Sequence, residues 1–502
     1  MILSRSWLQS ALLCLALAMF VLPASAHVGS PDVYVEGNAG PYKLLVVVRP
    51  PLVIPGVADI ELRSESPGIE RIEITPIPLT GEAAKYPPVP DAMQRPSAQF
   101  FTGHLWLMAT GSWQIRFTVY GSKGSGVFSA PVPATAIATR KMQPGLGVML
   151  AILGIILVGG LVSIVGAATR DAQLAPGAEA TPERRRRAYV AMTITLVLLI
   201  GAVVFGNRWW GAEAADYSRY IYKPLQMQAE LKPGDVLDLR LSDPGWLKQR
   251  RLDDFIPDHD HVMHLYMLRW PAMDVVFHLH PEVAGPGDFS LRLPSVPAGN
   301  YRLYADVVHE NGFPETIVGS ITLPKISGNP LGGDDAEGTS IPLRNAGEPI
   351  QTRSSYKLPD GYTMVWKRPE TLIAKTPYDF TFELRDPEQR PAAEMALYMG
   401  MPGHAAFIKS DGTVFAHIHP SGTASMAAMM IAQAQNRAGS NDAAATQNDM
   451  AAMPGMSQPG MPNTVSFPYG FPSPGTYRII VQMKHGSVIE TGFFDAEVAP
   501  VP

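Results

Sequence analysis

One stretch of sequence occurs twice in the chain, and this duplication constrains the fold more than any other feature. The later copy reads MGMPGHAAFIKSDGTVFAHIHP (399–420), and the earlier copy reads MHLYMLRWPAMDVVFHLHP (263–281). Each copy has a His, an apolar run, a turn, and a second apolar run that ends in His-x-His-Pro. Two apolar runs joined by a short turn predict a β-hairpin. We therefore expect two matching hairpins.

The turn of the later copy predicts which residues face each other. Asp411-Gly412 is a strong signal for a two-residue hairpin loop. That loop pairs position 404 with position 419, so His404 and His419 lie on one face, and His417 projects from the same face. In the earlier copy a looser turn centred on Ala272 pairs His264 with His280, and the corresponding set is His264, His278 and His280.

The duplication continues downstream and adds a fourth His to each copy. PAGNYRLYADVVHENG (297–312) resembles SPGTYRIIVQMKHG (473–486), which places His309 and His485 at matching positions. Imidazole clusters suit zinc, copper, iron or nickel. Each copy therefore predicts one metal site, with His309 or His485 as an additional candidate ligand. The alternative is that His-x-His-Pro is a structural turn with hydrated side chains.

Methionines near the later copy indicate copper. Met399 and Met401 immediately precede His404, and residues 421–463 form a low-complexity insertion rich in Ala and Met. Thioether sulfur selects Cu(I) over zinc. A plain linker that binds nothing is the alternative for this insertion. The segment Asp258-His259-Asp260-His261 precedes the earlier copy. We expect it to be a hydrated loop, and an extension of the metal site is the alternative.

The N-terminus predicts secretion and leaves no thiol chemistry. Residues 1–26 have a positive start, an apolar core and an A-x-A cleavage site, as secretory signals do. The only Cys, Cys14, lies within that segment, so disulfides and Cys-ligated metals are excluded from the mature chain. Cleavage would leave His27 as an N-terminal residue whose amine and imidazole can hold one metal ion, with His104 as the candidate partner. An accidental His at the junction is the alternative.

Two apolar runs, 146–168 and 188–207, predict a transmembrane hairpin. The loop between them, 169–187, contains Arg184-Arg185-Arg186-Arg187, and basic loops favour the cytoplasmic side. With the secretory signal, this places the remaining domains outside the cytoplasm. It predicts a bacterial inner-membrane protein that faces the periplasm, and the Arg run gives no reason to expect nucleic-acid binding.

The rest of the chain reads as short strands separated by Gly, Pro and Ser. This pattern predicts an all-β fold of three Ig-like or cupredoxin-like β-sandwich domains, with the transmembrane hairpin between the first and the second. The expected domains are residues 27–140, 213–324 and 357–502, with a linker at 325–356.

Three features together resemble periplasmic copper proteins. The signal–His27 start followed by a β-sandwich resembles the CopC and YtkA-like copper-binding proteins. The order of sandwich, two membrane spans and further sandwich is similar to the B subunit of particulate methane monooxygenase. The Met-Pro-Gly-Met tract resembles the Met-rich stretches of copper-resistance proteins. These resemblances imply copper handling.

The sequence thus predicts a membrane-anchored copper-binding protein that sequesters the metal, confers resistance or delivers it to a periplasmic or membrane copper protein. Zinc or another divalent metal is the alternative cofactor. A cupin-like metal-dependent oxidase or oxygenase is the alternative function, because His-x-His on a strand also occurs in such enzymes. A structural or sensory module without metal is the third hypothesis.

Overall fold

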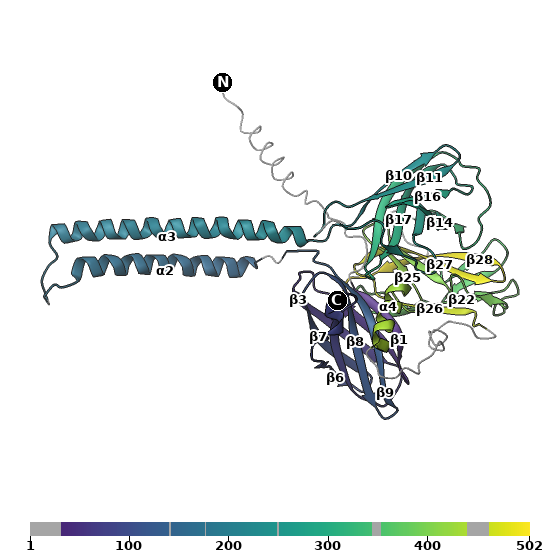
Figure 1. Cartoon of the computed structure of the whole chain (residues 1–502), viewed down its shortest axis with the longest axis horizontal. Coiled ribbons are helices and arrows are strands. Elements are labelled where there is room, and N and C mark those ends of the chain that lie inside the picture. The colour runs from purple at the N-terminus through teal and green to yellow at the C-terminus, as the bar shows by residue number, and fades with distance from the viewer. Residues whose placement is uncertain (1–31, 140–141, 176, 248–249, 344–352, 439–460) are drawn as a thin grey trace, which may run out of the picture.

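The computed structural model describes residues 32–139, 142–175, 177–247, 250–343, 353–438 and 461–502. The expected signal segment and His27 lie outside these residues. Within them the chain forms six β-sheets and three α-helices. Strands dominate, as expected, and two long helices project side by side from the sheets (Figure 1).

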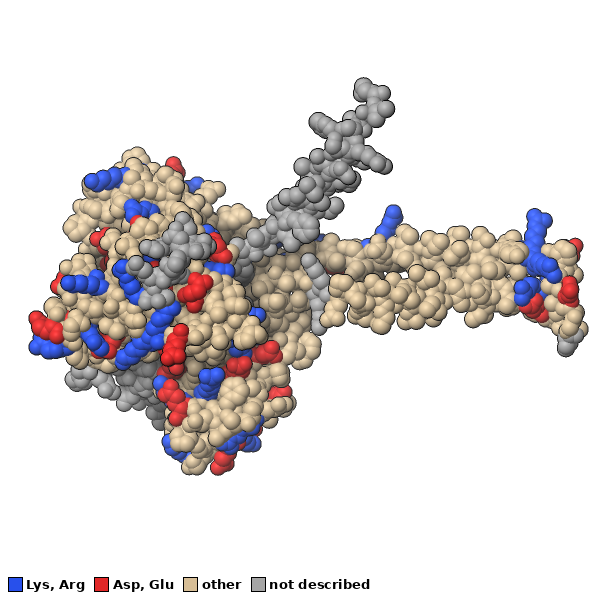
Figure 2. Space-filling view, turned by 180° about the vertical axis from the view of Figure 1, so that it is seen from behind, with Lys and Arg blue, Asp and Glu red and all other residues tan. Residues whose placement is uncertain are grey.

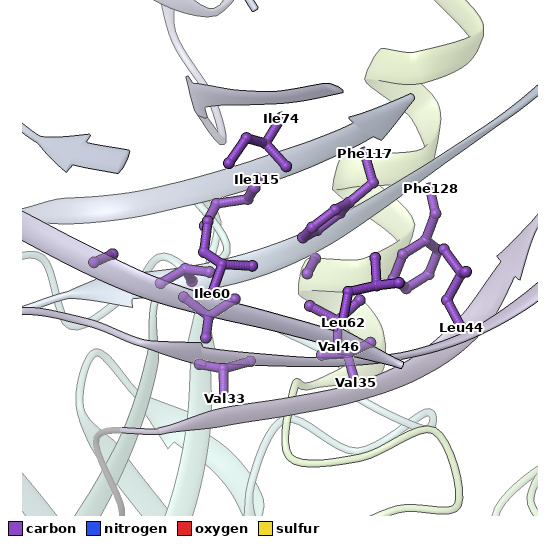
Figure 3. Close-up of a cluster of buried hydrophobic side chains, with 14 of the residues drawn as sticks. Val33, Val35, Leu44, Val46, Ile60, Leu62, Ile74, Ile115, Phe117 and Phe128 are labelled. Carbon is purple, nitrogen blue, oxygen red and sulfur yellow. The ribbon is translucent and has the colours of Figure 1, made fainter. Parts of the chain in front are cut away.

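Residues 33–134 form the N-terminal sheet pair. One sheet has the order β1-β2-β3-β7-β6, and the other has the order β5-β4-β8-β9. Alternate residues of these strands are buried between the sheets, and Figure 3 shows Val35, Leu62, Phe117 and Phe128 within this core. The strands are β1 (Val33–Ala39), β2 (Tyr42–Arg49), β3 (Gly56–Ser64), β4 (Ile69–Pro78), β5 (Asp91–Ala92), β6 (Gln94–Ser97), β7 (Phe100–Leu107), β8 (Gly111–Gly121) and β9 (Gly124–Ala134).

The two long helices are α2 (Pro144–Asp171) and α3 (Pro182–Tyr217), and both are long and apolar enough to cross a membrane. Pro144 and Pro182 stand at the helix starts, where proline costs no hydrogen bond. The Arg run lies in the first turns of α3 and not in the loop, because Thr181 caps the helix before Arg184. Figure 2 shows these charges at the end of the helical pair far from the sheets.

Residues 226–339 form the central sheet pair. Its smaller sheet has the order β10-β11-β16-β15, and its larger sheet has the order β12-β17-β13-β14-β19, with β18 paired to β17. The strands are β10 (Gln226–Lys232), β11 (Val236–Ser242), β12 (Phe255–Ile256), β13 (His264–Arg269), β14 (Val275–Leu279), β15 (Glu282–Gly285), β16 (Asp288–Arg292), β17 (Gly299–His309), β18 (Pro314–Leu323) and β19 (Ala336–Thr339). Strand β19 comes from the segment that we expected to be a linker.

Residues 355–498 form the C-terminal sheet pair. One sheet has the order β20-β21-β22-β26, and the other has the order β23-β27-β24-β25, with β28 paired to β27. The strands are β20 (Ser355–Lys357), β21 (Thr363–Trp366), β22 (Tyr378–Arg385), β23 (Met395–Ala396), β24 (His404–Lys409), β25 (Phe415–Ile418), β26 (Thr464–Tyr469), β27 (Gly475–His485) and β28 (Val488–Val498). Helix α4 (Met426–Ala438) lies in the insertion between β25 and β26.

Both hairpins have the predicted register. Leu265 pairs with Leu279 and Ala405 pairs with Ile418, which places His264 opposite His280 and His404 opposite His419. The later turn is wider than the expected two-residue loop, since Lys409 N donates to Val414 O. It is still centred on Asp411-Gly412, and Gly412 has φ 71°, a conformation that favours glycine.

The two hairpin sheets pack against each other through the faces that their own sandwiches do not use. Strands β13, β14 and β24 are buried on both faces, which explains why their residues are almost all apolar. Tyr304 stacks on Phe415 with ring centroids 4.3 Å apart. The contacts are reciprocal: Arg302 donates to Gly412 O in the later hairpin turn, and Arg478 donates to Met273 O in the earlier one. The duplicated segments therefore face each other as equivalents.

Candidate metal centre

Eight of the twelve histidines meet where the two hairpin sheets face each other. Contacts cross between the copies, since His264 and His278 lie 5.4 and 5.5 Å from His417, measured between ring centroids. We expected two separate sites, one in each copy. The structure instead places both sets in one buried cluster. Its members are His259, His261, His264, His278, His280, His404, His417 and His419.

The first group of potential ligands comprises His264, His278 and His280, whose ligand nitrogens lie within 4.8 Å of one another. An oxygen holds the outer nitrogen of each ring. His264 Nε2 donates to the carbonyl oxygen of Asp258 at 2.9 Å, His278 Nδ1 to Gln482 at 2.9 Å, and His280 Nδ1 to Asp335 at 2.9 Å. Metal-ligating histidines are oriented in this way, with the second nitrogen left for the ion.

The inner nitrogens of this group carry lone pairs that face each other. His264 Nδ1 lies 3.3 Å from His278 Nε2, and the protons of both rings are on their outer nitrogens. His280 Nε2 is buried without a hydrogen-bond partner among the described residues. Two opposed lone pairs and an unpaired buried nitrogen are unfavourable without a cation. The donor set therefore fits a metal ion.

The second group comprises His259, His404 and His419, again with nitrogens within 4.8 Å. His404 is fully buried, and neither of its ring nitrogens has a hydrogen-bond partner among the described residues. His259 Nε2 is likewise without a hydrogen-bond partner among these residues. Buried polar atoms are nearly always hydrogen-bonded, so this concentration of unpaired nitrogens offers donor atoms that suit a metal ion.

His417 lies between the two groups. Its ring centroid is 4.7 Å from that of His419, and its Nδ1 contacts Asp306 at 3.3 Å. Asp306 and Gln482 occupy equivalent positions in the duplicated segments. Each contacts the His of the other copy, since Gln482 binds His278. The centre is therefore assembled from both copies and is incomplete in either alone.

Burial keeps the imidazoles neutral. It lowers the pKa of His264, His278, His404 and His419 well below the usual 6.5, and repulsion between the clustered rings lowers it further. Only a neutral imidazole offers a lone pair to a metal ion. The cluster is therefore ready to bind at neutral pH.

Four residues of the centre were missed from sequence. His259 and His261 lie in a tight turn of the type found at Tyr398–Met401, with the same reciprocal backbone bonds between its end residues. We expected this turn to be a hydrated loop, but His261 stacks on His280 with centroids 3.9 Å apart. Asp334 and Asp335, in the expected linker, contact His261 and His280. The sequence did contain a signal for this turn, because residues 258–264 (DHDHVMH) align without a gap with residues 398–404 (YMGMPGH).

The methionines near the later copy pack in two different apolar clusters. Met399 is buried beside Ala336 and Tyr398, and the Tyr398 hydroxyl lies 3.3 Å from His278 Nδ1. Met401 instead joins a core cluster with Met426 and Met429 of the insertion. The insertion was expected to be a low-complexity segment. In the structure its helix α4 buries Met426 and Met429 in this core. Met450, Met453 and Met456 lie outside the described residues.

The fourth His of each copy lies away from the cluster. His264 is paired with Asp306 and His404 with Gln482, so His309 and His485, three residues further along their strands, project from the opposite sheet face. His309 contacts Asp254 and Glu315. His485 forms a separate group with Asp360 and Glu490, where burial and a hydrogen bond with Asp360 raise the pKa of Glu490 to about 7.

His104 lies on the surface of the N-terminal sheet pair, where it contacts Asp59 at 2.8 Å. Both side chains are exposed, so the geometry there is that of a surface ion pair. Its proposed partner, His27, lies outside the described residues, and the N-terminal copper site stays a prediction.

A cavity of about 940 Å³ opens onto the centre. His264, His417 and His419 lie in one wall. Trp113 and Pro133 of the N-terminal sheet pair and Tyr222, shortly after α3, lie in the others. A small molecule or an incoming ion can therefore reach the imidazoles from the junction of all three sheet pairs.

Comparisons with known proteins identify no function. Residues 356–500 match a family model described as "Domain of unknown function (DUF8832)". No curated protein matches the chain. Solved structures that match include a bacterial ice-binding adhesin in a study of cell-surface retention (5% identity, 89% of this chain and 92% of that chain, TM-score 0.15). Another is a putative membrane anchored protein from Corynebacterium diphtheriae (9%, 94% and 96%, TM-score 0.14).

Proposed function

We propose that this protein is a membrane-anchored copper-binding protein whose cluster of eight histidines sequesters copper or passes it to a partner. The observation that carries the proposal is the set of buried imidazole nitrogens without partners in both histidine groups. A structural cluster would satisfy these nitrogens by hydrogen bonds. Imidazoles of this number and burial instead favour a transition-metal ion.

Copper is favoured over zinc by a buried methionine in the turn that precedes His404. Met399 is buried next to Tyr398, which contacts His278, and thioether sulfur favours Cu(I). The resemblance of the sequence to CopC-type proteins and to the methane monooxygenase subunit supports the same metal. When bound, copper would add redox chemistry, while the protein's own side chains orient the imidazoles and exclude bulk water.

The anchor supports an extracytoplasmic position for the centre. The Arg184–Arg187 run lies at the end of the helical pair opposite the sheets (Figure 2). Basic residues at helix ends favour the cytoplasmic side, so the sheets would lie on the other face of the membrane, in the bacterial periplasm. A periplasmic or membrane copper protein would be the partner.

A metal-dependent oxidase is the second candidate, and the cavity is the observation that favours it. A pure storage site has no need for a substrate-sized space, and His264, His417 and His419 are among the residues that line this cavity. Oxidation of a small molecule by the copper-loaded protein would favour this candidate over storage.

The test is copper binding by the full-length protein in detergent, with titrations of Cu(I), Cu(II) and zinc. We expect tight copper binding that is lost in a His278→Ala/His404→Ala/His417→Ala variant and kept in a His104→Ala variant. The second variant is the matched control, because it removes a histidine outside the cluster. Failure of the folded wild type to bind copper would overturn the proposal.

A further inference from the structure

The centre contains more donors than one metal ion can use. A copper or zinc site in a protein takes about four side-chain ligands. Eight imidazoles converge here, and their orphan nitrogens are divided between two groups. One ion placed in the first group would leave the buried nitrogens of His259 and His404 unpaired. The free-energy cost of burying those nitrogens without partners would therefore remain.

The two groups differ in their supports. The rings of the first group are held by Asp258, Gln482 and Asp335. In the second group, neither ring nitrogen of His404 or His419 has a hydrogen-bond partner among the described residues. The hydrogen bonds that orient the first group therefore involve no residue of the second group.

The groups are close enough to influence each other. The ring centroids of His259 and His264 are 6.2 Å apart, and those of His278 and His404 are 6.4 Å apart. His417 contacts both groups, and its Nε2 is a further buried nitrogen without a partner. An ion in either group therefore lies within reach of the same intermediate imidazole.

We infer that the centre binds two copper ions at once, one held by His264, His278 and His280 and the other by His259, His404 and His419, with His417 between them. This inference rests on the proposed function and specifies the capacity of that site. It also assigns a role to His259, which sequence reasoning placed in a loop.

The test measures metal stoichiometry in the full-length protein in detergent, by elemental analysis after copper loading and desalting. We expect two copper ions per chain in the wild type. His280→Gln and His259→Gln each remove one ligand from a different group, so each should bind one ion. The double variant should bind none tightly. Circular dichroism checks that each variant keeps its strands.

Electron paramagnetic resonance of the Cu(II) form gives an independent readout. Each single variant should show the spectrum of one isolated Cu(II). The wild type should depart from the sum of those two spectra, by lost intensity or a half-field signal, because the two ions are neighbours. A wild type that equals the sum would overturn the shared centre.

The possible failures are distinguishable. No copper in the folded wild type would overturn the proposed function itself. A single ion in the wild type, removed equally by His280→Gln and His259→Gln, would overturn only the two-ion inference and leave copper binding in place.

Discussion

The two copies of the duplicated segment share one backbone geometry and differ in chemistry. Both place a His at the start of a strand and a His-x-His at the end of its partner, in the same register. The tight turn before the strand carries His259 and His261 in the earlier copy and Met399 and Met401 in the later one. At these equivalent positions the earlier copy contributes two imidazoles to the cluster, whereas in the later copy Met399 packs beside Tyr398 and Met401 packs in a core.

The largest difference between the copies is expected at the equivalent arginines. Arg478 is buried, forms paired bonds with Asp495 and donates to Met273 O, whereas Arg302 is half-buried over Trp270. Arg478→Ala leaves Asp495 without its partner and should lower the free energy of unfolding by about 3–5 kcal/mol. Arg302→Ala should cost about 1–2 kcal/mol. Thermal unfolding of the metal-free protein measures both, and equal losses would contradict the asymmetry.

The next comparison concerns Asp306 and Gln482, which contact a His of the opposite copy. Removing a group that orients a ligating His weakens metal binding by about 10–100-fold. Gln482→Ala should therefore weaken the ion of the first group, while Asp306→Ala should act through His417. Competition with a chromophoric copper chelator gives the affinities. If neither variant changes them, these contacts do not orient ligands.

Met399→Leu tests whether the thioether of Met399 contributes to Cu(I) binding. This swap conserves volume and should cost less than about 1.5 kcal/mol of stability. It removes the thioether, so we expect weaker Cu(I) binding and unchanged zinc binding. Parallel titrations with the two ions provide the control within one variant. An equal loss for both ions would indicate a packing effect instead.

A smaller effect is expected from the fourth His of the earlier copy. Burial disfavours the charged form of His309, but hydrogen bonds with Glu315 and Asp254 outweigh it, so the pKa is raised above 6.5. A raised pKa stabilises the fold below the unfolded-state value, and this contribution is lost as pH rises through the folded-state value. The unfolding temperature should therefore decrease as pH rises from below the ordinary His pKa through the raised folded-state pKa of His309. His309→Gln should flatten that slope.

The smallest effect is expected at His104, which lies outside both copies and serves as the control for the histidine substitutions within them. Its ion pair with Asp59 is exposed, so His104→Ala should change stability by less than about 0.5 kcal/mol. The copper stoichiometry of the cluster should stay the same. A loss of one ion would instead support the N-terminal site that the sequence predicts.

Local features of the hairpins could be read from sequence because they depend on nearby residues. Asp411-Gly412 fixed the centre of one turn, and strand alternation then placed His404, His417 and His419 on one face. The same rule indicates why His309 and His485 lie elsewhere, since their odd offset from Asp306 and Gln482 reverses the face. That offset required the strand pairing, which sequence alone did not supply.

The merger of the two sets into one centre could not be predicted, because it depends on which sheet faces pack together. The apolar residues that drive this packing, such as Ile408 and Phe415, look the same in sequence whether they face their own sandwich or another sheet. Asp335 could not be predicted for a similar reason. The Gly-rich segment that contains it gave no sign of β19, the strand that pairs with β14. His259 was different. It aligned with Met399 and could have been found by extending the repeat.

The assembly of the centre from two distant hairpins has a consequence for how the protein matures. Domains generally fold as they leave the ribosome, N-terminal parts first. The first hairpin is complete at His280, but Gln482, which orients His278, follows that histidine 204 residues later in the chain. Until Gln482 is in place, His278 lacks the side chain that orients its ring, whereas Asp258 and Asp335, which support His264 and His280, precede Gln482 in the chain. The proposed metal centre would therefore be complete only after the strand that carries Gln482 has docked, which would separate the synthesis of the early imidazoles from the time of loading.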